Sequence, residues 1–359
     1  MNKINLSSIA KKITDWYKTH QRELPWRKTK DPYHIWLSEI ILQQTRISQG
    51  LSYYHKLSHQ FPNIRALANA PLTDVLKTWQ GLGYYSRARN MHKTAKIIAE
   101  HYQGNFPDDY KQLLKLPGIG PYTGAAIISI AFEQAYAVVD GNVSRVLARI
   151  FNIQTPINST GGKKQFQHLA GQMIQNVQPS DFNQAMMDFG AILCSPQNPK
   201  CSTCPVKNYC QAYQLGKTED LPVKIPSKKQ KNRHFHYLFI EDEGYTYIKQ
   251  RNKQDIWHSL YEFPLIETTT PLSKEKIQQT REWKEIAGNP ENYKILNISK
   301  KQIHQLTHQK IHARFYHLRS LNPGIPNPHY QRIHINELSK YPVSRLIENF
   351  IEKINFDPK

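Results

Sequence analysis

Residues 116–127, LPGIGPYTGAAI, place Gly118 and Gly120 between two predicted helices. Glycine reaches backbone angles that are closed to other residues, so this segment predicts a tight helix–helix turn. The turn would direct backbone N–H groups outward at the start of the second helix, where an anion such as a phosphate is favoured. Many helical turns use such a glycine pair, so its meaning depends on the sequence around it.

The sequence after the turn adds a candidate acid. Residues 121–132 are almost wholly apolar and predict a buried helix. The segment AYAVVDGNVSR, residues 135–145, then places Asp140 directly before another predicted helix, with Asn142 two residues later. Asp140 therefore suits an N-cap, and N–H groups that donate to its carboxylate would keep it ionised.

All four cysteines lie further along the chain, in residues 194–210, CSPQNPKCSTCPVKNYC. In a reducing cytosol, clustered cysteines are more often metal ligands than disulfides. Structural zinc sites usually pair two close knuckles, whereas the spacing here is C-x6-C-x2-C-x5-C. Four thiolates in one loop can also hold a [4Fe–4S] cluster. The spacing by itself favours the cluster and leaves zinc open.

The composition indicates a polyanionic partner. The 359-residue chain has 48 Lys and Arg against 28 Asp and Glu, a net charge of +20. No strongly amphipathic basic helix stands out, so nucleic acid is favoured over a membrane. No apolar run of about 18 residues predicts a transmembrane helix, and the start lacks a signal-peptide core. We expect a cytoplasmic, nucleoid-associated monomer.

Three regions can be distinguished along the chain. Residues 1–217 predict an all-helical region, in which Asp31 and Pro32 begin one helix and residues 86–104 form another. Residues 218–233 are polar and contain proline, which predicts a linker. Residues 234–359 predict a smaller domain of mixed α and β structure.

Two elements of the third region have clear patterns. HYLFI and YTYIK, residues 236–240 and 245–249, flank a turn and predict a β-hairpin. Residues 341–354, YPVSRLIENFIEKI, predict a closing helix whose apolar stripe contains Ile347, Phe350 and Ile351 together with Ile354. That stripe is most simply core packing.

The cysteine spacing, the glycine turn and Asp140 together resemble the endonuclease-III-like DNA glycosylases. The resemblance implies an all-α helix-hairpin-helix domain with a six-helix lobe at about residues 25–130 and an iron–sulfur lobe at about 1–24 plus 131–217. It implies a structural [4Fe–4S] cluster on Cys194, Cys201, Cys204 and Cys210. It also implies that Asp140 is a catalytic aspartate beside the sugar C1′, with Asn142 assisting it.

The segment LSEIILQQT, residues 37–45, narrows the resemblance. On a helix, Glu39 shares a face with Ile35, Trp36 and Leu42. Such a carboxyl is either a boundary residue or a buried group with a raised pKa. Residues 24–46 and the GLGYYSRARN of residues 81–90 closely resemble the MutY family of adenine DNA glycosylases, whose general acid is this glutamate.

This second resemblance implies a substrate and a mechanism. The substrate is double-stranded DNA with adenine paired to 8-oxoguanine or guanine, and the adenine is flipped out of the stack. Glu39 protonates adenine N7, and ionised Asp140 stabilises the cationic sugar. Tyr122 occupies the position of the Schiff-base lysine of bifunctional relatives, which implies a monofunctional enzyme. The implied DNA-contacting or base-contacting residues are Trp26, Arg27, Gln43, Gln44, Thr45, Leu82, Tyr84, Gly118, Gly120 and His312.

Residues 234–359 resemble the Nudix-like domain that MutY proteins use to recognise 8-oxoguanine. Ile286 and Ser273 stand where a Nudix hydrolase needs carboxylates, so we expect no pyrophosphohydrolase activity. The family's Phe-Ser-His tip is expected within QLTHQKIHARF, residues 305–315, as Lys310, Ile311 and His312. Only the histidine would then remain, and the degree of 8-oxoguanine selectivity stays open.

Two alternatives share the scaffold. One is an endonuclease-III-type glycosylase for oxidised pyrimidines, which Glu39, Tyr122 and the C-terminal region oppose. The other is an inactive iron–sulfur DNA-binding protein, which Glu39 and Asp140 oppose. A zinc-ribbon regulator is a third alternative, and the colour of the purified protein would distinguish it.

Overall fold

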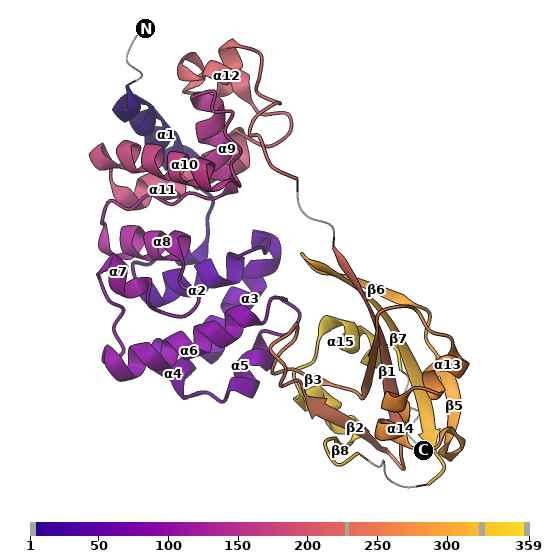
Figure 1. Ribbon diagram of the computed structural model, residues 1–359. Coiled ribbons are helices and arrows are strands. Elements are labelled where there is room, and N and C mark those ends of the chain that lie inside the picture. Colours follow the sequence, from indigo (N-terminus) through magenta and orange to yellow (C-terminus); the bar gives the residue numbers. More distant parts are fainter. Residues whose placement is uncertain (1–4, 227–229, 323–326, 355–359) are drawn as a thin grey trace. The chain divides into compact units, whose positions relative to one another are not determined.

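The computed structural model describes residues 5–226, 230–322 and 327–354 and contains two compact units (Figure 1). The first, the helical unit, comprises residues 1–69 and 90–226. The second, the C-terminal unit, comprises residues 227–359 together with the segment 70–89. The boundary at Pro226 falls in the segment predicted as a linker, of which residues 227–229 lie outside the described residues.

The helical unit is built from α-helices and short 3-10 turns. Its α-helices are α1 (Leu6–His20), α2 (Pro32–Leu42), α3 (Ile47–Gln60), α4 (Ile64–Asn69), α6 (Ser86–His101), α7 (Tyr110–Leu113), α8 (Pro121–Phe132), α9 (Gly141–Ile150), α10 (Thr160–Met173), α11 (Pro179–Asp188) and α12 (Gln211–Gln214). The first residues of α6 belong to the C-terminal unit by their contacts. Within the described parts of the chain, every helix is too short or too polar to cross a bilayer.

Two hydrophobic clusters position the predicted acids. Ile35 on α2 packs with Ala125, Ala126 and Ile130 on α8, and both helices lie side by side as expected for a buried apolar pair (Figure 1). A larger cluster joins α1 to the helices that follow residue 137. The prediction that residues 121–132 form a buried helix is confirmed, because α8 has the same bounds and is buried through its middle.

The glycine turn joins α7 to α8, and only one of its glycines needs to be glycine for conformational reasons. Gly118 has φ +81°, and a Cβ there would come within 2.9 Å of Asn90. Gly120 has φ −90°, which any residue can adopt, so the prediction of special backbone angles was wrong at this position. A Cβ on Gly120 would meet nothing within 4 Å, so the glycine leaves open space before the first turn of α8.

The C-terminal unit contains two sheets. Its elements are α5 (Leu72–Thr78), β1 (Lys231–Glu241), β2 (Tyr245–Gln250), β3 (Tyr261–Glu262), β4 (Leu265–Thr268), α13 (Lys274–Gln278), α14 (Arg281–Ala287), β5 (Tyr293–Ile298), β6 (Gln302–Gln305), β7 (Gln309–Ser320), β8 (Gln331–His334) and α15 (Arg345–Ile351). The larger sheet has the order β4-β1-β7-β5 with β6 also on β7, and the smaller has the order β3-β2-β8. β1 begins at Lys231, inside the predicted linker.

The predicted hairpin of β1 and β2 was wrong. The turn is present, with a single bridge between Asp242 and Tyr245, but β2 pairs with β3 and β8 in the other sheet. β1 pairs instead with β7 in parallel. The closing helix is confirmed as α15, shorter than predicted, with Ile347 and Phe350 buried in the core on one face of the larger sheet.

Pairing in the larger sheet gives each face a separate partner. Phe235, Phe239 and Phe315 lie on the face that packs against α15. Leu238 and Leu318 lie on the opposite face, where Trp283 of α14 packs on them. Because side chains alternate along a strand, residues with even numbers in β1 and β7 share this second face.

Candidate active site

A cavity of about 370 Å³ in the helical unit contains both predicted acids. Its volume is in the range of ligand-binding pockets. Of the predicted residues, Glu39, Asp140, Tyr122, Asn142, Trp26, Arg27 and Thr45 line it together. These residues come from the turn before α2, from α2 and its end, and from the starts of α8 and α9. Packing of α2 on α8 therefore brings together groups that are far apart in sequence.

Glu39 is a buried carboxyl on α2, with 8% of its surface exposed. Burial raises the pKa of Glu39 from its ordinary 4.5 to about 7. Its interaction with the Tyr122 hydroxyl lowers the pKa, the charge of Asp140 raises it, and the charge of Arg27 lowers it. Glu39 can therefore hold a proton near neutral pH, which an exposed glutamate cannot do.

We expect this raised pKa to make Glu39 costly for stability at alkaline pH. A carboxyl whose pKa is higher in the folded state favours folding at low pH, and this contribution is lost as the pH rises from about 4.5 to about 7. The unfolding free energy of Glu39→Gln minus that of the wild type should therefore rise by about 2–3 kcal/mol when the pH is raised from 5 to 8. Denaturant unfolding at both pH values checks this, and an unchanged difference would contradict it.

Asp140 is the N-cap of α9, as predicted. Its carboxylate accepts the N–H of Val143 at 2.7 Å and the side-chain amide of Asn142 at 3.1 Å. Burial nevertheless raises the pKa of Asp140 above its ordinary value, although these hydrogen bonds and the charge of Arg145 oppose the rise. The hydrogen bonds of the cap therefore do not decide the pKa of Asp140 alone, because desolvation has the largest effect on it.

Tyr122 lies in the first turn of α8, where its hydroxyl interacts with Glu39. The hydroxyl donates to the Sδ of Met187 at 3.5 Å and interacts with the Glu39 carboxyl. Burial raises the pKa of Tyr122, and the charges of Glu39 and Asp140 raise it further. A neutral phenol at this position can orient a carboxyl group, but it cannot form a Schiff base.

Sequence reasoning missed the anchor of the cavity wall, Asp188 at the end of α11. This fully buried carboxylate accepts two hydrogen bonds from Arg27, at 2.7 and 2.8 Å, and others from Arg22. Burial raises the pKa of Asp188, but Arg27 and Arg22 outweigh it and hold the pKa below its ordinary value. The sequence feature that could have revealed Asp188 is its position as the single acidic residue of the apolar segment MMDFGAIL. The pair fixes Arg27 next to Trp26.

The other predicted DNA-contacting residues lie outside the cavity lining. Gln44 is exposed with φ +57°, and Gln43 donates to Thr123 at 3.2 Å. Leu82 is buried, with 6% of its surface exposed. Tyr84, in contrast, is 46% exposed and lies on a turn with φ +48°, so its ring is accessible from solvent.

His312 does not lie at a loop tip. Lys310, Ile311 and His312 are all within β7, where they pair with residues 232–234 of β1. The tip between β6 and β7 is Leu306, Thr307 and His308 instead. The earlier placement was wrong because the β6–β7 register, which the sequence does not reveal, decides which residues turn. Tyr84 in the same unit hydrogen bonds to Thr307 at 2.9 Å.

The four cysteines line one cavity next to α9. Burial raises the pKa of Cys204 to about 12, so metal binding must replace its proton. Four thiols around one cavity are the ligand set that a [4Fe–4S] cluster requires.

Two buried arginines connect this loop to the acid pair. Arg149 donates to the Sγ of Cys194 at 3.4 Å and to the carbonyl of Ser195 at 2.7 Å. Arg145 donates to the carbonyl of Cys194 at 2.8 Å and to the Oδ1 of Asn142 at 2.9 Å. The sequence feature that could have revealed both arginines is the presence of basic residues within an otherwise apolar helix. The cysteine loop thereby helps to orient the start of α9.

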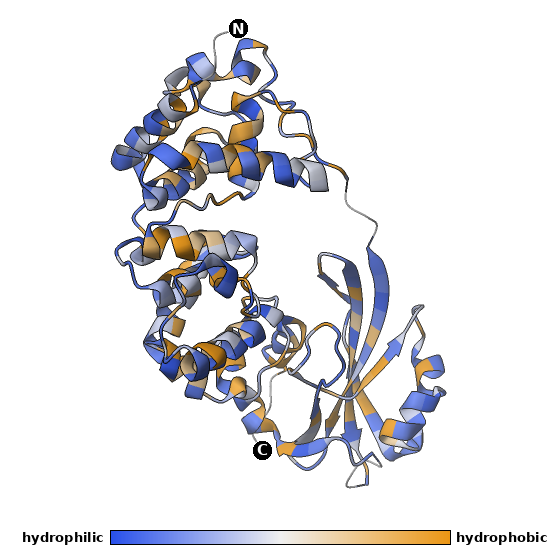
Figure 2. Ribbon diagram, turned by 60° about the vertical axis from the view of Figure 1, so that its left-hand side comes forward, coloured by the Kyte–Doolittle hydropathy of each residue, from blue (hydrophilic) through white to orange (hydrophobic). Residues whose placement is uncertain are grey.

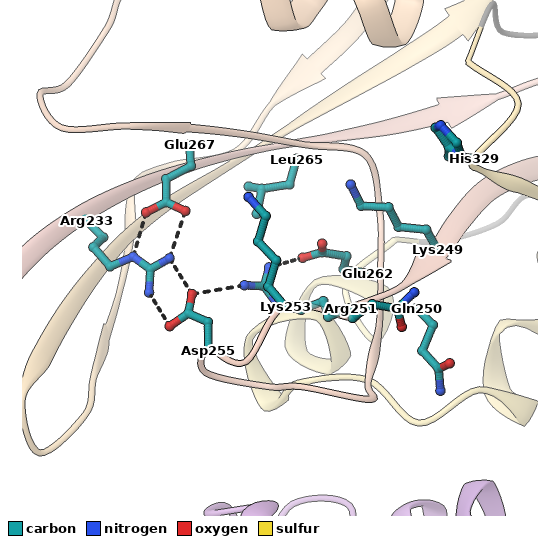
Figure 3. Close-up of a pocket in the computed structure, with 11 residues that line it drawn as sticks. Arg233, Lys249, Gln250, Arg251, Lys253, Asp255, Glu262, Leu265, Glu267 and His329 are labelled. Atoms are coloured by element: carbon teal, nitrogen blue, oxygen red, sulfur yellow. Dashed lines mark hydrogen bonds and ion pairs between the residues drawn. The ribbon is translucent and has the colours of Figure 1, made fainter.

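A second cavity, of about 620 Å³, lies in the C-terminal unit (Figure 3). Arg233 lies between Asp255 and Glu267, with contacts of 2.6–3.0 Å. Arg251 pairs with Glu262 in the same wall. Because the carboxylates here already bind arginines, they form an internal ionic network.

Comparisons with known proteins agree with this architecture. Residues 37–170 match the HhH-GPD superfamily of base excision DNA repair proteins, residues 194–210 the iron–sulfur binding domain of endonuclease III, and residues 236–353 the NUDIX domain. The adenine DNA glycosylase of Buchnera aphidicola subsp. Baizongia pistaciae is 37% identical over 307 residues, 82% of each chain. The human adenine DNA glycosylase is 42% identical over 218 residues, 58% of this chain and 40% of that protein.

Solved structures resemble the helical part. A thermostable thymine-DNA glycosylase is 31% identical with a TM-score of 0.55, covering 58% of this chain and 97% of that chain. A non-covalent endonuclease III–DNA complex is 21% identical with a TM-score of 0.51, covering 60% of this chain and 99% of that chain. The second likeness concerns the fold alone.

Proposed function

Because this chain belongs to the family of adenine DNA glycosylases, enzymes of base excision repair, we propose that it excises adenine mispaired with 8-oxoguanine or guanine. The observation that carries the proposal is the pair of buried carboxyls in one cavity, with Glu39 titrating near pH 7. Two carboxyls held in different protonation states are what acid-assisted glycosidic cleavage requires.

The proposed reaction begins when adenine leaves the base stack and enters the cavity. Protonated Glu39 gives its proton to adenine N7, which makes the base a neutral leaving group. The bond between the base and C1′ breaks, and its electron pair leaves with adenine. Tyr122 acts as a positioning residue, because its hydroxyl interacts with the Glu39 carboxyl.

Asp140 stabilises the positive charge that develops on the sugar. Its hydrogen bonds from Val143 and Asn142 fix the carboxylate at the start of α9. Water then adds to C1′ and gives a proton to the Glu39 carboxylate, which restores the acid and leaves an abasic site. Trp26 and Arg27 form part of the wall that receives the flipped base, with Arg27 fixed by Asp188.

The mispair would be read from the C-terminal unit. The tip residues Leu306, Thr307 and His308 resemble the family's Phe-Ser-His tip position by position. The first is apolar, the second carries a hydroxyl and the third is histidine. Reading of 8-oxoguanine therefore rests on this tip rather than on His312. The hydrogen bond between Tyr84 and Thr307 within one unit supports a role for Tyr84 in contacting the duplex next to the tip.

The iron–sulfur loop has a structural role. Cys194, Cys201, Cys204 and Cys210 supply the four thiolates that a [4Fe–4S] cluster requires, and the match to an iron–sulfur binding domain covers these residues. When bound, the cluster supplies a rigid, electron-rich core that holds the loop in place. Lys207 lies between Cys204 and Cys210 in the sequence, and its side chain is exposed and available for contact with a DNA phosphate.

The proposal is tested by single-turnover excision on duplexes with adenine opposite 8-oxoguanine, guanine, cytosine and thymine. We expect adenine release from the first two pairs, fastest opposite 8-oxoguanine, and little from the A·T pair. Equal rates opposite all four partners would contradict mispair recognition. Absence of adenine release together with release of an oxidised pyrimidine would contradict the whole assignment.

We also expect no covalent enzyme–DNA intermediate, because Tyr122 stands where a Schiff-base lysine would be needed. Borohydride treatment during turnover should trap no adduct, and abasic DNA should not be cleaved by β-elimination above background. Tyr122→Lys is a matched gain-of-function variant, which is expected to yield a trapped adduct. A strong adduct with the wild type would contradict the monofunctional mechanism.

A further inference from the structure

One face of the larger sheet in the C-terminal unit carries basic and imidazole side chains where β1 and β7 begin. In the parallel register of these strands, Asn232 pairs with Lys310, His234 with His312, and His236 with Arg314. Paired residues point to the same side of a sheet. His236 is buried, with 4% of its surface exposed, whereas the other five side chains and Lys301, just before β6, form one patch, which we call the strand-start patch. Figure 2 shows the hydrophilic character of the start of β1.

The patch is built as a surface rather than as core. The rings of His234 and His312 stack at 4.8 Å with an interplanar angle of 12°. His312 Nε2 contacts the Oδ1 of Asn232 at 2.9 Å, and its Nδ1 has no hydrogen-bond partner in the described structure. Arg314 and Lys301 are exposed. Ile303, which pairs with His312 on the other side, is 53% exposed.

The charges around the stacked rings are of one sign. Burial lowers the pKa of His312, and His234, Lys301 and Lys310 lower it further. Burial also lowers the pKa of His234, with Lys301 as the charged group that adds to it. Each charged neighbour that shifts the pKa of these two rings is therefore basic. Cations gathered in this way repel one another, which an anionic ligand would relieve.

The opposite face of the same strand shows the contrast. Arg233, one residue before His234, points to the other side and is held between Asp255 and Glu267 (Figure 3). The protein thus neutralises the basic residue on one face with its own carboxylates. The strand-start patch has lysine and arginine at the surface next to the tip of residues 306–308.

We propose that the strand-start patch binds the sugar–phosphate backbone of duplex DNA. Lys310, His312 and Arg314 are spaced by two residues along β7, so they cover about 13 Å, a length that spans several phosphates of one strand. Contacts of this kind position a protein on the duplex without reading sequence. The inference rests on the proposed function because it takes DNA as the substrate. It adds a phosphate-binding site that would hold the tip of residues 306–308 against the duplex.

The test measures binding of the full-length holoprotein to a short, fully paired duplex, which contains no substrate and so makes the result independent of excision. The variant is Lys301→Gln/Lys310→Gln/Arg314→Gln. Each lost phosphate contact should reduce the slope of log K against log salt by about 0.9, so the triple variant should lose a slope of roughly 2–3. Single variants should each lose about 1, which separates a local effect from a general one.

The matched control removes three exposed charges from other parts of the same unit, Lys284→Gln/Lys294→Gln/Lys353→Gln. Its slope is expected to stay near that of the wild type. Equal slopes for the wild type and the patch variant, or equal losses for patch and control variants, would overturn the proposal. Circular dichroism and the visible absorption of the protein verify that the variants are folded. If adenine excision fails while the slope still falls, the proposed function is wrong and the phosphate site stands.

Discussion

Glu39→Gln is expected to lower the single-turnover rate of adenine excision by about 10³-fold while duplex binding changes little. The amide has nearly the same shape as the protonated carboxyl, so the cavity should keep its packing. It cannot give up a proton, so adenine N7 stays unprotonated and the base remains a poor leaving group. The loss should appear in the rate constant of the chemical step and not in the affinity.

The pH dependence makes this prediction more specific. Since burial raises the pKa of Glu39 to about 7, the wild-type excision rate should fall as pH rises through that value. The small residual rate of Glu39→Gln should lack this descending limb. Glu100→Gln, the same change at an exposed position of the helical unit, serves as the control and should behave as the wild type. Excision by Glu39→Gln within tenfold of normal would remove Glu39 from the mechanism.

Asp140→Asn has the second largest expected effect, a loss of about 10²–10³-fold in the excision rate. Asparagine caps helices about as well as aspartate, so α9 should keep its start and the protein its stability. Only the negative charge beside the developing sugar cation is lost. This substitution therefore separates the catalytic role of Asp140 from its structural role as an N-cap.

The control for this change is Asp109→Asn, at the exposed N-cap of α7, where the side chain accepts the N–H of Gln112 at 2.8 Å. Both variants should show thermal midpoints close to the wild type, and only Asp140→Asn should lose activity. Asp140→Ala should in addition lose about 1 kcal/mol of stability, because alanine cannot cap. An Asp140→Asn protein with a normal rate would leave Asp140 as a cap alone.

Some features follow from local sequence. Asp140 could be identified as a cap because a capping side chain acts on N–H groups only two or three residues away. The buried helix 121–132 follows from its composition, since a helix that is apolar all round has to be covered. The cysteine spacing, contained within residues 194–210, similarly indicated an iron–sulfur ligand set. In each case the deciding contacts are between neighbours in the chain.

Other features depended on partners far away in sequence. The β1–β2 hairpin was predicted from two strand patterns and a turn, but each strand pairs in a different sheet. The tip was placed at Lys310–His312 because alternation along a strand does not show where the strand begins, and the pairing of β6 with β7 moved it to residues 306–308. Asp188 and Arg149 became meaningful only through their partners Arg27 and Cys194.

The sequence by itself determined which side chains can perform acid–base chemistry and hold iron, because those properties belong to residue types and short spacings. The tertiary structure alone decided that Glu39 and Asp140 share one cavity, and that Glu39 is desolvated enough to keep its proton near pH 7. A raised pKa is produced by everything that excludes water from the carboxyl. The cavity around Glu39 is lined by residues of several elements, among them Tyr122 and Ile130 of α8, which are distant in the chain and adjacent only after folding.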